Sequence, residues 1–199
     1  RPMAMSMLGN GLSAANHIVD ALSVQEATLS TLRRLGAPEG ATLAAQDNLA
    51  STYRALGRSE EALRLKRDAY SGRLELDGEQ HVGTLSAALN YASSLVDLQH
   101  FEEAKSLMRK TTPVARRALG EQHRLTLKMR WAYAVVLFRA TGATLDDLRE
   151  SVTTLEDTTR IMRRVLGGAH PLTDEIGDVL LKARAALRAR ETPPTKGDS

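Results

Sequence analysis

Three histidines recur along the chain at similar intervals, at His81, His123 and His170. Imidazole binds zinc, and a zinc ion needs every ligand within about 2.1–2.3 Å. The intervals place each histidine in an equivalent loop between two-helix units. With helices about 8–10 Å apart, neighbouring loops lie on the order of 15–20 Å from one another. The three side chains therefore cannot share one metal. We expect each to pack against or cap a helix junction, and we predict no metal and no cofactor.

Acidic pairs also recur, and neighbouring carboxylates could act as a general acid and a general base. The pairs are Glu60-Glu61, Glu102-Glu103 and Asp146-Asp147. Each stands where the second helix of a unit should begin, and negative charge there complements the helix dipole. Their repetition favours that structural role over a catalytic dyad. Cysteine is absent, and the sequence has neither a Gly-x-Ser-x-Gly motif nor a phosphate-binding loop. We therefore predict that the chain is not an enzyme.

The composition excludes several other classes. Aromatic residues make up 4% of the 199 residues, so a core must be built from Leu, Ala, Val and Met, which suits helix-on-helix packing. The longest apolar run, Trp131–Phe138, is too short to span a bilayer, so no membrane insertion is expected. The chain begins at Arg1 rather than Met, which indicates a processed product or an excised fragment. The localisation is therefore unknown; the cytoplasm is expected if no targeting segment has been removed.

The sequence repeats at a step of 42 residues. The tetrapeptide Gly-Glu-Gln-His at residues 78–81 returns at residues 120–123, and Gly-Gly-Ala-His stands at 167–170 after about five inserted residues. Shorter matches keep the same step, among them Thr42-Leu43, Thr84-Leu85 and Thr126-Leu127, and Ala50, Ala92 and Ala134. A fixed period of this length indicates a stack of structural repeats.

Each unit is predicted to contain two helices. Gly57 breaks the first unit between them, Gly78 is the expected C-cap of the second helix, and Thr84 and Thr126 are expected N-caps. A helix is expected at residues 8–15, and Gly9 and Gly11 within it lower its stability. The predicted division is a degenerate or truncated first repeat at 1–41, repeats at 42–83 and 84–125, a repeat with an insertion at 126–172, a capping helix at 173–191 and a flexible tail at 192–199.

This pattern resembles the 42-residue tetratricopeptide repeat of the kinesin light chain type. The residues that carry the resemblance are Asn48-Leu49-Ala50, Tyr53, Gly57 and Glu61-Ala62 in one unit, Asn90-Tyr91-Ala92, Glu103-Ala104 and Leu119-Gly120 with His123 in the next, and Leu166-Gly167 with His170-Pro171 in a third. The match covers roughly residues 8 to 190. It implies an all-α fold, a right-handed α-solenoid of antiparallel two-helix repeats. HEAT and armadillo repeats have similar lengths, but this spacing of Ala, Gly and Asn is not expected in them.

The resemblance also implies a working surface. First helices of such repeats line a concave groove, and Asn48 and Asn90 stand where the family's asparagines bond a ligand backbone; Ala132 departs from this in the third repeat. Trp131 is either a binding hot spot or a core residue beneath the insertion. The residues expected to bind a peptide or protein are Asn48, Ser51, Arg54, Asn90, Ser93, Lys128, Trp131, Val135 and Phe138.

A chaperone-type carboxylate clamp, in which Lys, Asn and Arg grip a C-terminal carboxylate, is rejected. Asn90 and Lys128 match its pattern, but Asp47 would repel a carboxylate where a lysine is required. Ser51 replaces an asparagine and Ala132 replaces an arginine.

Two functions follow from the resemblance. The first is a scaffold or adaptor that binds a peptide or protein segment in the groove, and the second is a structural subunit built into a larger multiprotein assembly. An RNA-binding helical repeat is less favoured, because the arginines fall on second helices and few aromatic residues are present to stack bases. The sequence identifies no particular partner, and nucleic acid is not expected to be one.

Overall fold

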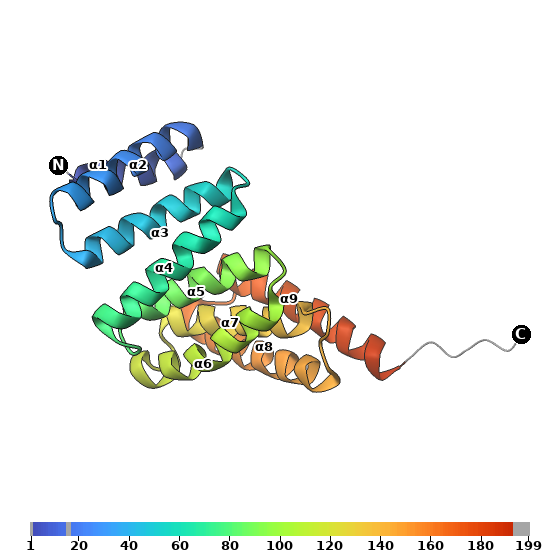
Figure 1. Cartoon of the computed structure of the whole chain (residues 1–199). Coiled ribbons are helices and arrows are strands. Elements are labelled where there is room, and N and C mark those ends of the chain that lie inside the picture. Colours follow the sequence, from blue (N-terminus) through green and yellow to red (C-terminus); the bar gives the residue numbers. More distant parts are fainter. Residues whose placement is uncertain (1, 15–16, 193–199) are drawn as a thin grey trace, which may run out of the picture. The chain divides into compact units, whose positions relative to one another are not determined.

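The computed structural model describes residues 2–14 and 17–192, which form an all-helical chain without strands (Figure 1). The helices of this part of the chain are α1 (Pro2–Ala14), α2 (Ile18–Arg34), α3 (Glu39–Ala55), α4 (Ser59–Asp77), α5 (Val82–Asp97), α6 (Phe101–Leu119), α7 (Arg124–Arg139), α8 (Leu145–Leu166) and α9 (Pro171–Glu191). Each is joined to the next by a short connection. The predicted all-α repeat fold is confirmed. The predicted tail, apart from its first residue, lies outside the described residues.

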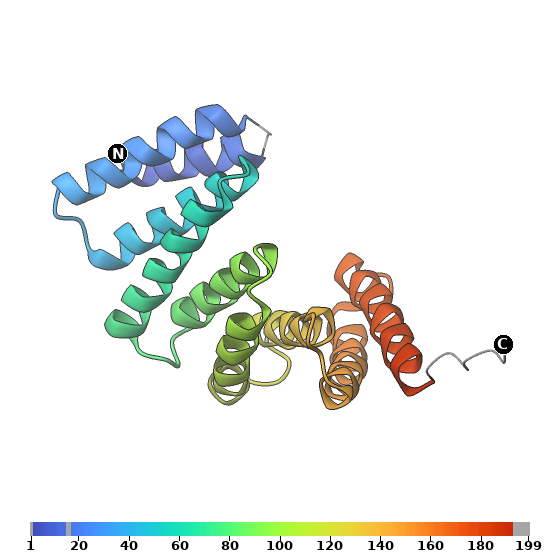
Figure 2. The same cartoon turned by 45° about the vertical axis from the view of Figure 1, so that its right-hand side comes forward.

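The chain divides into two compact units, Arg1–His100 with α1 to α5 and Phe101–Ser199 with α6 to α9. In unit 1, each helix packs on the next, and Figure 2 shows them as a series from blue to green. One apolar cluster, between α2 and α3, is built from Leu29, Leu32, Ala45 and Leu49. A side chain on Gly72 of α4 would place its Cβ 2.6 Å from Leu43 Cδ2 of α3. Glycine is therefore what allows these two helices to come so close.

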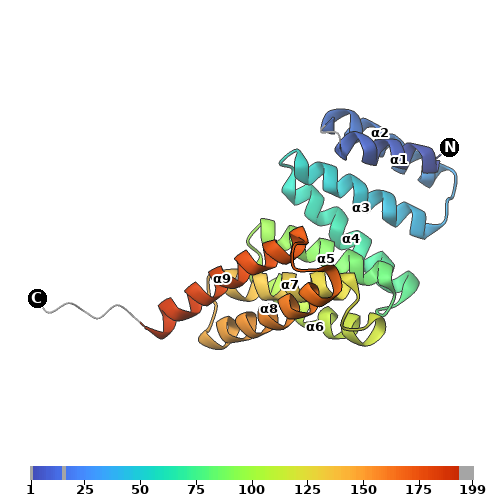
Figure 3. The same cartoon turned by 180° about the vertical axis from the view of Figure 1, so that it is seen from behind.

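In unit 2, α6 packs on α7, α7 on α8 and α8 on α9, and the last two lie along each other in the view from behind (Figure 3). One apolar cluster spans α7, α8 and α9, and its buried members are Leu127, Ala134, Val152, Leu155, Met162, Ile176, Leu180 and Ala183. The alanine recurring in the first helices is fully buried at Ala134. A larger side chain there would push α8 away from α7.

The three recurring histidines cap helices, as predicted. The Nδ1 atom of each accepts a hydrogen bond at 3.2 Å from the backbone N–H two residues later, at the starts of α5, α7 and α9. The prediction that Thr84 and Thr126 are N-caps is wrong, because these helices begin earlier, at Val82 and Arg124. Both threonine side chains instead donate back to carbonyls of the preceding helix, to Arg73 at 3.0 Å and to Ala115 at 3.3 Å.

The predicted C-cap at Gly78 is confirmed, and its equivalents end α6 and α8. Gly78, Gly120 and Gly167 have φ values of 80°, 91° and 94°. Side chains strongly disfavour this left-handed conformation, so glycine is required there.

The first helix is longer than expected. It begins at Pro2 and ends at Ala14, despite Gly9 and Gly11. A Cβ at Gly9 would lie 2.8 Å from Gln25 Cγ of α2. Gly9 thus costs helix propensity but allows close contact between α1 and α2, whereas nothing lies within 4 Å of a Cβ at Gly11.

Candidate protein-binding surface

In unit 1, helices α3 and α5 carry the predicted binding residues around a small pocket. Asn48 of α3 and Asn90 of α5 line this pocket, whose volume is about 190 Å³. Both side chains are half-buried, and the side-chain amide of Asn48 makes no hydrogen bond to any other residue that the structure describes. An amide in this state has two N–H donors and a carbonyl acceptor to offer an incoming chain.

A buried polar network lies beside this pocket and centres on Asp47. Lys66 of α4 is 4% exposed, and its Nζ donates to Asp47 Oδ1 at 2.9 Å, to the Asp47 carbonyl at 2.8 Å and to Ser51 Oγ at 2.9 Å. Asn90 Nδ2 donates to the other carboxylate oxygen of Asp47 at 2.9 Å. Two predicted binding residues, Ser51 and Asn90, are therefore already bonded within unit 1.

The electrostatics of the network follow from its depth. Burial lowers the pKa of Lys66, because a charged ammonium loses its hydration, while the Asp47 carboxylate opposes that shift. The Asp47 carboxylate accepts hydrogen bonds from both the Lys66 ammonium and the Asn90 amide. Asn90 keeps one N–H and its carbonyl oxygen for an outside ligand.

The other two predicted residues of unit 1 also have internal partners. Arg54 Nη1 pairs with Asp97 Oδ2 at 3.1 Å, joining α3 to α5 on an exposed face. Ser93 donates its hydroxyl hydrogen to the Leu89 carbonyl of its own helix at 3.0 Å. The Ser93 oxygen can still accept a hydrogen bond from a ligand.

In unit 2, the predicted residues Lys128, Trp131, Val135 and Phe138 lie on α7 and are all half-buried. Trp131 and Phe138 pack against the apolar cluster formed by α7, α8 and α9. The indole Nε1 of Trp131 is buried and finds no acceptor among the described residues. Trp131 is thus partly a core residue, and only part of its ring remains available for contact.

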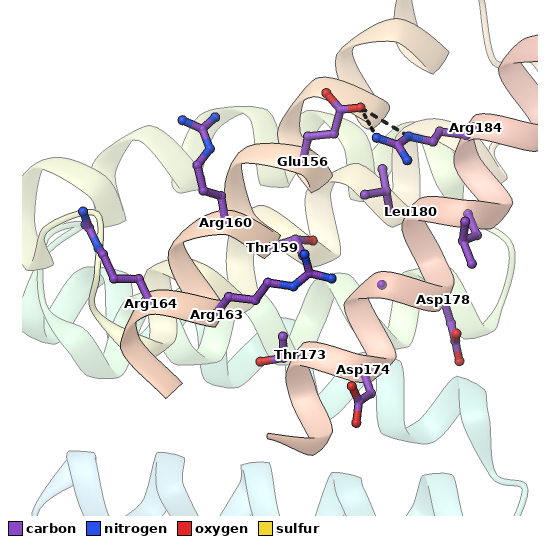
Figure 4. A pocket seen from close by; sticks show the side chains of 12 residues that line it. Glu156, Thr159, Arg160, Arg163, Arg164, Thr173, Asp174, Asp178, Leu180 and Arg184 are labelled. Atoms are coloured by element: carbon purple, nitrogen blue, oxygen red, sulfur yellow. Dashed lines mark hydrogen bonds and ion pairs between the residues drawn. The ribbon is translucent and has the colours of Figure 1, made fainter. Parts of the chain in front are cut away.

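Sequence reasoning missed a larger groove in unit 2, between α8 and α9 (Figure 4). Its volume is about 1210 Å³, and the arginines that line it are Arg160, Arg163, Arg164 and Arg184. The sequence placed these arginines on a second helix but did not indicate that they line a groove. The signal in the sequence was the register of α9, where Asp174 and Arg184 replace the Leu127 and Leu137 found 47 residues earlier.

The described part of the chain presents neither a metal-ligand cluster nor a membrane-spanning helix. Within residues 2–14 and 17–192, no three His, Asp or Glu side chains come together as metal ligands. No helix in these two segments is long and apolar enough to cross a membrane.

Comparison with known proteins agrees with the repeat assignment. A family profile described as tetratricopeptide repeat matches residues 42–82 and 84–125. A search of curated proteins gives no significant match. The solved structures similar to this chain include two of nearly identical TPR-like repeats from a protein described as a kinesin light chain of Podosopora anserina. Their TM-scores are 0.80 and 0.79, each at 20% identity, and the matches cover 95% and 96% of this chain and 87% and 90% of theirs.

A third similar structure is that of BtubC (BKLC) from P. vanneervenii. Its TM-score is 0.64 at 15% identity, over 98% of this chain and 84% of that one. At these identities the likeness shows the fold alone, and the profile match shows where the tetratricopeptide repeats lie. The chain contains tetratricopeptide repeats at residues 42–82 and 84–125 and has a fold similar to that of kinesin-light-chain-type repeats.

Proposed function

We propose that this chain is a scaffold or adaptor that binds a peptide or protein segment on the α3–α5 surface of unit 1. The α7 residues Lys128, Trp131, Val135 and Phe138 are proposed as contacts within unit 2. Tetratricopeptide repeats are in general protein–protein interaction modules. The observation that carries the proposal is Asn48: its half-buried amide lines the pocket and has no hydrogen-bond partner among the described residues. A half-buried polar group without a partner gains a hydrogen bond when a ligand backbone reaches it.

The surface favours one kind of segment. Asn48 and the free N–H of Asn90 can bond the backbone of an extended chain, which gives affinity without selecting a sequence. Asp47 lies between them and is only partly exposed. A segment with neutral or basic side chains fits this surface better than one rich in carboxylates, since a second carboxylate near Asp47 would be repelled.

Substitution at Asn48 tests the assignment. Tagged wild-type chain and the Asn48→Ala variant would each be used to capture partners from the source cell extract, with quantitative mass spectrometry. We expect Asn48→Ala to lose a partner captured by the wild type, since it removes the unpaired amide and no internal hydrogen bond. Ser71→Ala, an exposed change on α4 of the same repeat, is the matched control and should capture the partner normally.

Asn90→Ala requires a separate check, because it also breaks the hydrogen bond to Asp47. Loss of binding by this variant supports the assignment only if its melting temperature equals that of the wild type. If Asn48→Ala and Asn90→Ala both retain the partner at wild-type levels, the α3–α5 surface is not the binding site.

A second candidate function is a structural subunit in a larger assembly. The observation in its favour lies at the start of unit 1, where Met7, Leu8 and Val19 are 68%, 55% and 69% exposed. Large apolar side chains exposed on α1 and α2 are the kind of surface that a partner covers in an assembly. On this hypothesis the isolated chain should self-associate or aggregate, and a monodisperse monomer in analytical sedimentation would count against it.

A further inference from the structure

The groove between α8 and α9 contains arginines whose charge is not neutralised. Arg184 Nη2 pairs with Glu156 at 2.7 Å, and Arg160 pairs with Asp157. Arg163 and Arg164 make no ion pair or hydrogen bond with any described residue. The α8 wall of the groove therefore carries positive charge that no described residue neutralises.

The floor of the groove also has an unsatisfied polar group. Thr159 is 5% exposed, and its buried Oγ1 atom has no hydrogen-bond partner. Figure 4 shows the Thr159 hydroxyl and the Arg163 guanidinium on the same side of α8, both directed toward α9. On α9, a Cβ at Gly177 would meet nothing within 4 Å, so the space opposite is open. A carboxylate in that space would accept hydrogen bonds from both Thr159 and Arg163.

The same groove occurs one repeat earlier, where a helix fills it. The repeat step is 47 residues here, 42 plus the five inserted residues. At this step Thr159 corresponds to Thr112, and the α8–α9 groove corresponds to the groove between α6 and α7. Helix α8 covers the earlier groove and leaves about 230 Å³ of it open. The Tyr133 hydroxyl of α7 donates to Glu150 of α8 at 2.8 Å, and Asp157 of α8 lies 3.9 Å from Arg130 of α7. In that groove the acidic side chains of α8 meet Tyr133 and Arg130 of α7. The equivalents of these two residues on α9 are Leu180 and Gly177, so in the α8–α9 groove positive charge comes from the arginines of α8 instead.

An ordinary apolar second helix would not fit the α8–α9 groove. Leu127 and Ala134 of α7 pack in one apolar cluster with α8, and Leu137 is buried. The corresponding residues of α9 are Asp174, Leu181 and Arg184. Covering Asp174 with apolar side chains would bury an unpaired charge. Leu181 stands where α3, α5 and α7 have alanine, and it is 64% exposed.

We propose that the α8–α9 groove binds an α-helix of a partner protein that has one acidic and one basic edge. An acidic side chain binds Arg163 and Thr159, an apolar side chain packs on Leu181, and a basic side chain faces Asp174 and Asp178, which have no partner among the described residues. The acidic edge of the helix thus faces the basic wall of the groove, and the basic edge faces its acidic wall. Helix-in-groove recognition of this kind uses residues three, four and seven positions apart. This surface lies within unit 2 and is separate from the α3–α5 surface.

The test uses a synthetic helical peptide as the probe. The first peptide carries Glu at two positions seven residues apart, Leu between them and Lys on the opposite edge. A second peptide, the exchanged peptide, has the same sequence with Glu and Lys interchanged. Fluorescence anisotropy would measure binding to the full chain. We expect the first peptide to bind more tightly than the exchanged one. Arg163→Glu should weaken the first peptide about tenfold and strengthen the exchanged peptide, since the charge partner is reversed.

Two further variants control for structure. Arg117→Glu changes the equivalent of Arg164 on α6, outside the groove, and should bind like the wild type. Gly177→Leu places an apolar side chain in the groove and should abolish binding. Circular dichroism should stay unchanged, because a Cβ at this position meets no atom within 4 Å.

Four results would overturn the proposal. The first is equal binding of the first peptide to wild type and Arg163→Glu. The second is equal binding of both peptides to the wild type. The third is displacement of the bound peptide by millimolar inorganic phosphate as readily as by unlabelled peptide, which would mean a small-anion site. The fourth is self-association of the wild type that Arg163→Glu abolishes, which would make a second copy of the chain the occupant.

Discussion

At the scale of single residues, polar side chains join helices that are distant in sequence. Lys66 reaches Asp47 across 19 positions, and Asn90 reaches the same carboxylate across 43. Buried charges are stable only when they are paired and fully hydrogen-bonded. Asp47, which excluded a carboxylate clamp at the sequence level, thus also holds three helices of unit 1 together.

Asp47→Ala and Lys66→Met test this network. Asp47→Ala leaves a buried ammonium without its partner and should lower the free energy of unfolding by about 3 kcal/mol. The double variant should lose less than the sum of the single losses, by about 1–3 kcal/mol. Urea unfolding of the four proteins measures this coupling, and strictly additive losses would show that the ion pair contributes nothing.

The pH dependence of the Asp47→Ala variant has a definite sign. Burial holds the pKa of Lys66 below its ordinary value of 10.5, and without Asp47 nothing nearby opposes that shift. The unfolded chain then binds the proton more tightly than the folded one, so stability rises with pH up to about 10.5. The deficit of Asp47→Ala relative to wild type should shrink between pH 7 and pH 10, and a constant deficit would argue against a buried charge.

The capping histidines allow a second test at this scale. His123→Ala removes the acceptor for the Leu125 N–H and should cost about 1 kcal/mol of stability. His123→Ser supplies a hydroxyl at the same place and should retain most of that stability. His17 also occupies an N-cap position, but its side chain makes no capping hydrogen bond. His17→Ala should therefore change the urea midpoint less than His123→Ala does.

At the scale of elements, the two carboxylates of the acidic pair that begins α8 have different roles. Asp147 accepts from the Thr144 backbone N–H at 3.0 Å, completing a capping box, and also pairs with Lys105 Nζ of α6 at 2.6 Å. Its neighbour Asp146 has a side chain that is 93% exposed. The sequence predicts negative charge in this first turn, but only the structure shows that one carboxylate fastens α8 to α6.

Asp147→Asn tests that attachment through pH. Burial by itself raises the pKa of Asp147, but hydrogen bonds from Lys105 and Thr144 overcome it and hold the pKa below its ordinary value of 3.8. The carboxylate therefore stabilises the folded chain above pH 3.8, and the contribution disappears as the pH falls through the folded pKa. Asp147→Asn should cost about 2 kcal/mol at pH 7. Urea unfolding from pH 7 to pH 3 should show this difference narrowing, whereas a difference independent of pH would contradict the ionic role.

At the scale of the whole chain, the repeat period carried most of what the sequence could predict. It located the helices, the capping glycines and the capping histidines, because these features depend on residues close together in the chain. It misplaced the N-caps at Thr84 and Thr126, since a histidine that can take the same role stands three residues before each threonine. It also missed the Asp47–Lys66 pair and the α8–α9 groove, because both depend on which side chains meet across neighbouring helices.

The separate apolar clusters of the two units predict that stability is distributed locally along the chain. Leu155 is fully buried in the cluster shared by α7, α8 and α9, whereas Leu29 belongs to the cluster of α2 and α3. In a repeat protein, stability is a sum of repeat terms and nearest-neighbour terms. Leu155→Ala should cost about 2–5 kcal/mol and accelerate amide hydrogen exchange in α7, α8 and α9, while exchange in α2 and α3 stays unchanged.

Leu29→Ala is the reciprocal variant and should accelerate exchange in α2 and α3 while sparing α8 and α9. Peptide-resolved mass spectrometry distinguishes the two patterns in the intact chain. Uniform acceleration over all helices in either variant would mean that the chain unfolds as one cooperative body. Local acceleration would mean that a partner bound to one unit slows hydrogen exchange in that unit first. The acidic helical peptide should therefore slow exchange in α8 and α9 and leave exchange in α3 and α5 unaffected.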